Sequence, residues 1–199
     1  IRDLVRSRGL GDVYKRQVGE AAFYGPKLDV QSVNVYGKED TLFTIQIDFE
    51  LAERFDMSYV DADGNKKRPF IVHRSSIGCY ERTLALLIEK YNGALPAWMM
   101  YTQVKVLSLT DRTAAKTEEI TAALRLKGIR AEVDNRSEKV GFKIREAQLE
   151  KIPYMLVVGE KEAETDSVSV RTHKGTDGGA MSVDEFVQMI CEEIREKRR

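Results

Sequence analysis

The sequence predicts an α/β (α+β) protein in two parts: an antiparallel sheet, followed by a βαβαβ domain with a mixed sheet. Between residues 22 and 49, apolar and polar residues alternate with the period of strands that have one apolar and one polar face. From Gln103 onward, short apolar runs alternate with segments whose apolar residues recur at helical spacing. The change of pattern near residues 97–102 indicates a domain boundary.

The composition is that of a soluble globular protein, with 42% hydrophobic and 32% charged residues. A run of about 18 or more apolar residues would indicate a membrane span, and the sequence contains none, so no membrane partner is expected. The two cysteines, Cys79 and Cys191, lie far apart, which favours a reducing, cytoplasmic location over a disulfide framework. Because 32 basic residues balance 32 acidic ones, any surface for a nucleic acid must be local.

The first part continues with a surface hairpin and then with a strand that leads into a helix. Residues 61–64 read Asp-Ala-Asp-Gly, which is a hairpin turn signal. A short apolar strand over 70–72 ends in the polar pair His73-Arg74, and Gly78 permits a sharp entry into a helix over 80–91. A strand that delivers a histidine, followed by a helix that delivers an arginine, is typical of a functional site.

In the second part, strands are expected around residues 104–109, 129–133, 154–158 and 168–170, with helices between and after them. Asp111 is expected to cap the first of these helices. The strand around 168–170 is interpreted as an edge strand, followed by a loop over 174–179. Ser182 and Glu185 have the spacing of a capping box, which predicts the start of the last helix.

Five groups of residues resemble motifs of class II aminoacyl-tRNA synthetases and follow the order of those enzymes. One group is similar to the third signature motif of the class, in the form found in threonyl-tRNA synthetases: His73-Arg74 with Gly78, Glu81-Arg82 and Leu87-Ile88-Glu89. The other groups are Phe23-Tyr24-Gly25-Pro26-Lys27, Thr44-Ile45-Gln46-Ile47-Asp48-Phe49, Glu138-Lys139-Val140-Gly141-Phe142-Lys143-Ile144-Arg145-Glu146 and Ile152-Pro153-Tyr154-Met155-Leu156-Val157-Val158-Gly159. Several motifs in one order are far more specific than any single motif.

The resemblance implies two domains. Residues 18–98 would be the C-terminal portion of a class II antiparallel-sheet catalytic domain, including the third motif, and residues 103–196 would be an anticodon-binding domain. Residues 1–17 lie outside the resemblance and are interpreted either as a leader foreign to the fold or as a disordered basic terminus. The family's magnesium-binding and dimerising motifs would lie upstream, so this chain alone is expected to be catalytically inactive.

The same resemblance implies a pocket for threonine and its adenylate. The substrate-binding residues would be Tyr24, Lys27, Gln46 and Cys79, the catalytic ones Lys27, Gln46 and Arg82, and the ATP-binding ones Gln46 and Arg82. The alternatives are an ordinary sheet with one wet face and, for Arg82, a solvated helix residue. A planar guanidinium suits stacking on adenine better than a lysine does. Cys79 replaces the family's usual small hydroxyl residue, and a thiol is a poorer hydrogen-bond partner.

His73 corresponds, by resemblance, to a zinc ligand of the threonyl enzymes, whose other cysteine and histidine would lie upstream. Zinc needs three or four ligands, whereas Cys79 is on the next helix and His173 is distant in sequence. In that family the zinc takes the amino and hydroxyl groups of threonine, which explains the rejection of valine. The alternative for a lone histidine at a strand end is a structural, hydrogen-bonding role.

Six residues would lie near the tRNA anticodon by resemblance: Ser137, Lys139, Arg145, Lys151, Lys161 and Glu162. Ser137 stands where the family often has an asparagine that reads a base, and Lys151 stands where some members have arginine. Hydrogen bonds to unstacked bases carry much of RNA specificity, so both departures concern contacts of that kind. The alternative for the basic residues of 136–151, Lys143 among them, is a solvated helix face.

The implied activity is that of a threonine–tRNA ligase, which activates threonine with ATP and transfers it to the 3′ end of its tRNA. The implied cofactors are Zn²⁺, ATP and Mg²⁺, and the implied partners are threonine, threonine tRNA and a second copy of the full-length protein in a homodimer. Two alternatives stay open: another class II synthetase, such as the prolyl enzyme, and a non-catalytic tRNA-binding module derived from a synthetase.

Overall fold

The computed structural model describes residues 18, 19 and 21–198, which fall into two compact units that divide between Leu84 and Ala85. The expectation for residues 1–17 therefore lies outside the described residues. Among the described residues, no helix combines the length and the apolar character that crossing a membrane requires.

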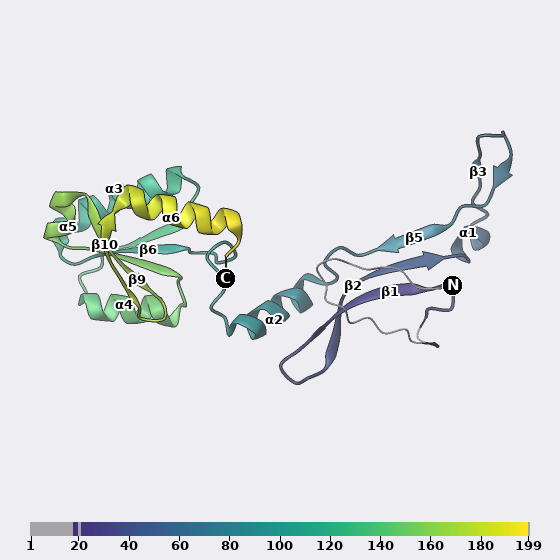
Figure 1. Cartoon of the computed structure of the whole chain (residues 1–199), viewed down its shortest axis with the longest axis horizontal. Helices are drawn as coiled ribbons and strands as arrows, with labels where there is room; N and C mark the ends of the chain where they lie inside the picture. Colours follow the sequence, from purple (N-terminus) through teal and green to yellow (C-terminus); the bar gives the residue numbers. More distant parts are fainter. Residues whose placement is uncertain (1–17, 20, 199) are drawn as a thin grey trace. The chain divides into compact units, whose positions relative to one another are not determined.

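A three-stranded antiparallel sheet with the order β1-β2-β5 forms the first unit (Figure 1). Its strands are β1 (Lys27–Val33), β2 (Glu39–Asp48) and β5 (Ile71–Arg74). The predicted pairing of β1 with β2 is confirmed, and the turn between them closes with a 2.9 Å hydrogen bond from Asn34 N to Lys38 O.

The predicted alternation of faces is also confirmed in this sheet. The register pairs Leu28 with Ile45, and Ile47 with Val72, so these side chains share one apolar face. The opposite face is polar and carries Lys27, Asp29, Thr44, Gln46, Asp48 and His73. The sheet therefore separates an apolar side from a side that can hold polar groups.

Short elements complete the first unit. They are α1 (Leu51–Arg54), the hairpin strands β3 (Tyr59–Val60) and β4 (Lys66–Lys67), and the start of α2 (Tyr80–Tyr91), which crosses the division between the units. The hairpin prediction is confirmed, because Gly64 N donates to Asp61 O at 3.1 Å, and Asp61 Oδ1 accepts from Asp63 N and Asn65 N. The predicted bounds of the helix over 80–91 are confirmed as well.

A five-stranded mixed sheet, with the order β10-β9-β8-β6-β7, forms the second unit. Its strands are β6 (Val104–Ser108), β7 (Ala131–Asp134), β8 (Tyr154–Val158), β9 (Ser167–Thr172) and β10 (Asp177–Ser182). Strand β6 pairs in parallel with both β7 and β8. Strand β9 is antiparallel to β8, and β10 is antiparallel to β9. The βαβαβ prediction with a mixed sheet is thus confirmed.

Helices cover both faces of this sheet: α3 and α6 lie on one face and α4 on the other (Figure 1). The helical elements are the 3₁₀ turn η1 (Asp111–Thr113), α3 (Ala114–Leu126), α4 (Val140–Leu149), α5 (Glu160–Thr165) and α6 (Val183–Glu196). Strand β6 feeds two cores, because Val104 and Val106 pack with α3 and α6, whereas Leu107 packs with Ala147 of α4. All five residues of β6 are buried, as expected for a parallel strand whose two faces are both covered.

The second unit differs from the sequence prediction in two places. The side chain of Asp111 does not cap a helix, because the 3₁₀ turn η1 begins at this residue. The hydroxyl of Thr113, at the end of η1, bonds to Thr110 O and to Val158 O. Strand β9 is not an edge strand, since β10 pairs outside it where a loop was expected. The segment 177–182 reads Asp-Gly-Gly-Ala-Met-Ser, which has little strand propensity, so its pairing with β9 left no local signal.

The capping box of α6 is confirmed, because Glu185 N donates to Ser182 Oγ at 3.2 Å.

Replacing Gly78 by alanine should lower the free energy of unfolding of the first unit. Its φ is +75°, and a Cβ there would overlap the carbonyl oxygen of Leu42. Gly37 has a φ of +77° and open space around it, so Gly37→Ala measures the backbone strain alone. We expect Gly37→Ala to cost about 1 kcal/mol and Gly78→Ala about 3 kcal/mol or more. Urea unfolding followed on resonances of β2 measures both, and equal losses would contradict the backbone overlap.

Candidate functional site

Three predicted pocket residues form a row across the sheet of the first unit. Lys27 lies opposite Gln46 on the neighbouring strand, and Gln46 lies opposite His73. Directly opposed residues project from the same face, so the three side chains leave the sheet on its polar side. Tyr24 joins them, because its hydroxyl donates to Gln46 Oε1 at 2.7 Å and its ring centroid lies 5.8 Å from that of His73. These four residues are called the polar row below.

Backbone contacts hold Tyr24 beside the row. Tyr24 O accepts a 3.0 Å hydrogen bond from Phe49 N, and Pro26 O accepts one from Ile47 N. Between them, Gly25 approaches β2 so closely that a Cβ would overlap the carbonyl oxygen of Ile47. A glycine is therefore required at this position for the tyrosine to reach Gln46.

An acidic side chain lies on each side of the row. Asp29 Oδ2 lies 2.8 Å from Lys27 Nζ, and its other oxygen accepts from the Thr44 hydroxyl. Asp48, which is fully buried, places Oδ2 2.8 Å from His73 Nε2. Burial alone would raise the pKa of Asp48, but hydrogen bonds from Leu51 N, His73 and Glu50 N together lower it below its ordinary value. The carboxylate beside His73 is therefore ionised near neutral pH.

The residues present fit one ligand position of a metal site rather than a complete site. Among the described residues, no group of three or more His, Cys, Asp or Glu side chains could hold a metal ion. One imidazole nitrogen of His73, Nε2, has a carboxylate partner, which is the usual arrangement of a metal-bound histidine. Any further ligands would have to come from outside the described residues.

Arg82 and Cys79 lie at the start of α2. Arg82 is exposed, and its Nη1 donates to Thr41 O at 3.3 Å. The exposed Cys79 thiol donates to Glu81 Oε2 at 2.7 Å, and this hydrogen bond lowers the pKa of Glu81. Gly78 N donates to Ser75 Oγ at 2.7 Å, which shapes the turn from β5 into the helix. The Cys79 thiol thus has a hydrogen-bond partner two residues along the chain, and the Arg82 side chain is exposed.

In the second unit, two predicted residues line a cleft of about 370 Å³ beyond the ends of β6 and β7. Ser137 comes from the loop after β7, and Lys139 immediately precedes α4; both are exposed. The complete lining is Ser108, Leu109, Thr110, Asp111, Arg136, Ser137, Glu138, Lys139 and Lys143. The carboxyl ends of parallel strands are where open α/β sheets commonly bind ligands.

Lys143 departs from the expected solvated helix face. It is 2% exposed, and its ammonium donates to Ser108 O and Ser108 Oγ at 3.0 Å each and to Asp134 O at 3.2 Å. A buried lysine needs such partners, and here all three are supplied by the ends of β6 and β7. The lysine therefore joins α4 to both strands beneath the cleft. Helical spacing places Lys143 with Ala147 on the inner side of α4, but lysine is so seldom buried that this spacing alone does not predict a buried ammonium.

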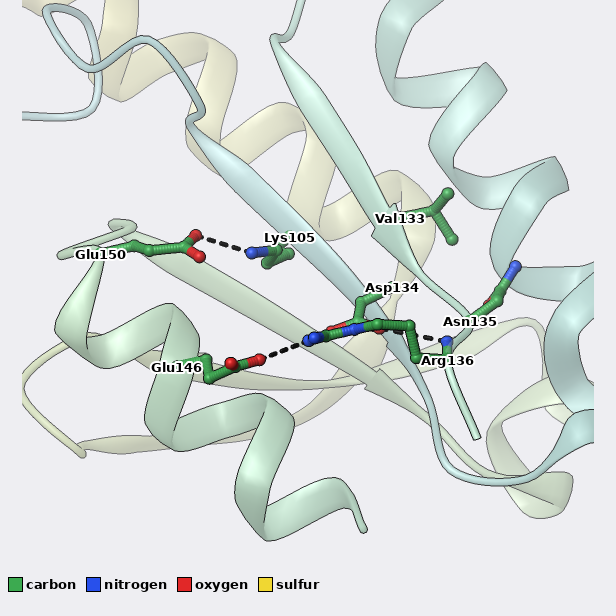
Figure 2. Close-up of a pocket in the computed structure, with 7 residues that line it drawn as sticks. All are labelled: Lys105, Val133, Asp134, Asn135, Arg136, Glu146 and Glu150. Atoms are coloured by element: carbon green, nitrogen blue, oxygen red, sulfur yellow. Dashed lines mark hydrogen bonds and ion pairs between the residues drawn. The ribbon is translucent and has the colours of Figure 1, made fainter. Parts of the chain in front are cut away.

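A second cleft, of about 290 Å³, lies beside α4 and holds a network of ion pairs (Figure 2). Arg136 bonds to Asp134 with Nη2–Oδ2 at 2.6 Å and also to Glu146, while Lys105 lies 2.6 Å from Glu150. The hydrogen bond from Arg136 lowers the pKa of Asp134 against the opposing effect of burial. The positive charge of Arg136 is thus satisfied within the protein.

The remaining predicted RNA-facing residues lie apart from the lining of the first cleft. Arg145 on α4 and Lys161 on α5 are exposed. Lys151 has a φ of +58°, and its ammonium donates a hydrogen bond to Asn92 O. Glu162 is half-buried and accepts from Gly159 N at 3.0 Å, so it closes the N-terminus of α5. The structure brings Ser137 and Lys139 together and gives Lys151 and Glu162 partners inside the protein.

Two family matches cover most of the chain. Residues 4–91 match the tRNA synthetase class II core domain (G, H, P, S and T), and residues 103–193 match the anticodon binding domain. The first match begins inside residues 1–17, which the sequence resemblance had left outside the family; the origin of that segment stays a prediction.

Similar proteins share a common name. A threonine–tRNA ligase of Clostridium botulinum (strain Eklund 17B / Type B) is 62% identical over 180 residues, which are 90% of this chain and 28% of that protein. One of Clostridium perfringens (strain SM101 / Type A) is 63% identical over 175 residues, 88% of this chain and 27% of that protein. The chain thus spans less than a third of the length of these curated relatives.

Solved structures give the same result for the fold. The RNA binding domain of threonyl-tRNA synthetase from Cryptosporidium parvum Iowa II has a TM-score of 0.78 at 32% identity, covering 87% of this chain and 44% of that chain. Prolyl-tRNA synthetase from Cryptosporidium parvum has a TM-score of 0.75 at 19% identity, covering 91% of this chain and 41% of that one. The second likeness concerns the fold alone.

Asp134 predicts a defined dependence of stability on pH. Because Arg136 lowers its pKa below the ordinary value of 3.8, the carboxylate stabilises the fold above that pH and loses this contribution as the pH falls further. Asp134→Asn should lower the Tm of the second unit by a constant amount above about pH 5, and this difference should shrink at lower pH. Thermal unfolding from neutral to acid pH measures it, with the exposed Asp111→Asn as the control. A difference that stays constant to the lowest pH would contradict the ion pair.

Proposed function

Since the chain belongs to the threonyl-tRNA synthetase family of class II aminoacyl-tRNA synthetases, we propose that the complete protein is a threonine–tRNA ligase. It would activate threonine with ATP and pass the threonyl group to the 3′ end of threonine tRNA. The observation that carries this proposal is the polar row, which lies in a class II core segment of the same chain that continues into an anticodon-binding domain. We further propose a homodimer in the cytoplasm.

In this proposal the polar row forms one wall of the threonine and adenylate pocket. Tyr24, Lys27 and Gln46 hold polar groups of the substrate, with the tyrosine hydroxyl fixing the orientation of the Gln46 amide. The ammonium of Lys27 suits a carboxylate or phosphate that carries negative charge during adenylate formation. Cys79 is proposed as a weaker polar contact of the same pocket. Catalysis then depends on orientation and charge stabilisation more than on proton transfer.

Zinc is proposed to bind at His73, together with ligands from other parts of the complete protein. When bound, the ion would act as a Lewis acid toward the amino and hydroxyl groups of threonine. The imidazole supports this role because its Nε2 already has a carboxylate partner, which leaves one nitrogen for a metal. ATP is proposed to bring Mg²⁺ on its phosphates, and Arg82 is proposed to stack on the adenine ring.

Arg82 gives a test of the ATP site. Arg82→Lys keeps the positive charge but loses the planar guanidinium, so the KM for ATP should rise about tenfold, equivalent to roughly 1.4 kcal/mol of lost stacking. ATP–pyrophosphate exchange by the complete protein measures this effect. Arg54→Lys, an exposed arginine of α1 paired with Glu50, is the matched control. An unchanged KM in the Arg82 variant would remove the stacking role.

We place the catalytic portion in residues 18–98 and tRNA recognition in residues 103–196. Ser137 and Lys139 would meet an anticodon base and its phosphate at the first cleft, and the exposed Arg145 and Lys161 would extend the contact. Lys151 and Glu162 would contribute only if RNA displaced their present partners. Lys139, Arg145 and Lys161 would supply a local basic surface on a chain whose overall net charge is zero.

Binding of this chain to a threonine tRNA transcript tests recognition directly. Changing the anticodon at fixed salt should weaken binding at least tenfold, or about 1.4 kcal/mol, because base contacts rather than phosphate contacts carry identity. Arg145→Ala should also weaken binding more than Lys127→Ala, an exposed lysine at the far end of α3. Equal binding of both transcripts would leave only non-specific RNA affinity, and the threonine assignment would then rest on His73 and the pocket residues alone.

A further inference from the structure

The carboxylate of Asp48 makes contacts in two directions at the end of β2. Its Oδ1 accepts hydrogen bonds from Glu50 N and Leu51 N, both at 2.9 Å. Its Oδ2 lies 2.8 Å from His73 Nε2. The side chain is completely buried, whereas that of His73 is 41% exposed. The aspartate is thus a fixed, internal group, and the histidine is the member of the pair that can meet a ligand.

We infer that Asp48 is a positioning residue: it holds the proton of His73 on Nε2 and presents Nδ1 as the nitrogen that donates an electron pair. The metal part of this inference rests on the proposed function of His73. The assignment of the proton does not, because it follows from the contacts within the chain.

The direction of the hydrogen bond follows from the chemistry of the two partners. An ionised carboxylate can only accept hydrogen bonds, so the Nε2 of a neutral imidazole beside it must carry the proton. A neutral imidazole has one N–H, and its other nitrogen, Nδ1, is then the acceptor or ligand. The two backbone donors on Oδ1 keep the carboxylate ionised and prevent it from rotating away.

The orientation of the ring is constrained from a second side. The Tyr24 ring lies 5.8 Å from the His73 ring at an interplanar angle of 57°, and the tyrosine is itself fixed through Gln46. Gln46 is the neighbour of His73 in the cross-strand row. The imidazole is therefore held between Asp48 and the other members of the polar row.

A simpler role for Asp48 would be to satisfy the first N–H groups of α1. That role needs Oδ1 alone, since Oδ2 makes no contact with the helix backbone. The two roles can therefore be separated by a substitution that keeps the first oxygen and changes the second atom. Asp48→Asn is that substitution, because an asparagine has one acceptor oxygen and one donor nitrogen.

Asp48→Asn should reverse the tautomer of His73. The two backbone donors require the amide oxygen, so the amide nitrogen must face Nε2 and donate to it. His73 should then carry its proton on Nδ1. Nitrogen-15 NMR of the imidazoles at about pH 8.5, well above the ordinary histidine pKa of about 6.5, distinguishes the tautomers. The chain has only two histidines, so His173 is the internal reference.

The control is Asp63→Asn, which removes a carboxylate from the exposed hairpin turn and should leave the His73 tautomer unchanged. Thermal unfolding shows whether each variant is folded. The unaltered chain provides a test that needs no variant, because a proton on Nδ1 there would overturn the inference. A folded Asp48→Asn variant that keeps the proton on Nε2 would overturn it as well.

The metal part has a separate test in the complete protein. Asp48→Asn should lower zinc affinity about tenfold or more, as is usual for loss of a partner of a metal-bound histidine, measured by competition with a chromophoric chelator. Unchanged zinc affinity beside a reversed tautomer would overturn the proposed metal role of His73 and support Asp48 as a positioning residue for another ligand. Reduced affinity beside a reversed tautomer would support both.

Discussion

The register of β2 against its two neighbours is the constraint on which the candidate site depends. Residues in a strand alternate between faces, so a slip of one residue would send Gln46 to the apolar side and replace it with Ile45 or Ile47. The same register places Lys27 and His73 on either side of Gln46. Apolar pairs such as Leu28 with Ile45 oppose a slip, because it would expose them to the polar side. The register of the strands thus determines which groups lie together on the polar face.

The second unit shows why a count of basic residues is a poor measure of an RNA surface. Arg136 is paired with Asp134 and Glu146, and Lys143 is buried beneath the cleft. These two charges support the corner between β7 and α4 rather than extend from it. Lys139 and Arg145, which are exposed, remain for a ligand. The structural cations hold the backbone that presents the exposed ones.

Much of this architecture could be predicted because local sequence and tertiary contacts agree. The strands of the polar row, the helix over 80–91 and the capping box of α6 all have strong local signals. Strand β10 could not be predicted, since its pairing depends on β9 and not on its own residues. The role of Asp48 could not be predicted either, because the sequence pattern of a polar strand face is the same whether the carboxylate accepts hydrogen bonds from solvent or from backbone N–H groups. Its position just before a helix start was the one available signal.

Two glycines bring neighbouring backbone against the carbonyls of β2, Gly25 at Ile47 and Gly78 at Leu42. At both points a hydrogen atom fits where a methyl group does not, so glycine is required at these two positions beside the strand. The side chains of the polar row take no part in these two close contacts, although Tyr24 and Gln46 are hydrogen-bonded to each other. Evolution could therefore exchange the polar groups on an unchanged backbone, with bonded partners such as Tyr24 and Gln46 changing together, and a related protein could acquire a different substrate preference without refolding its site.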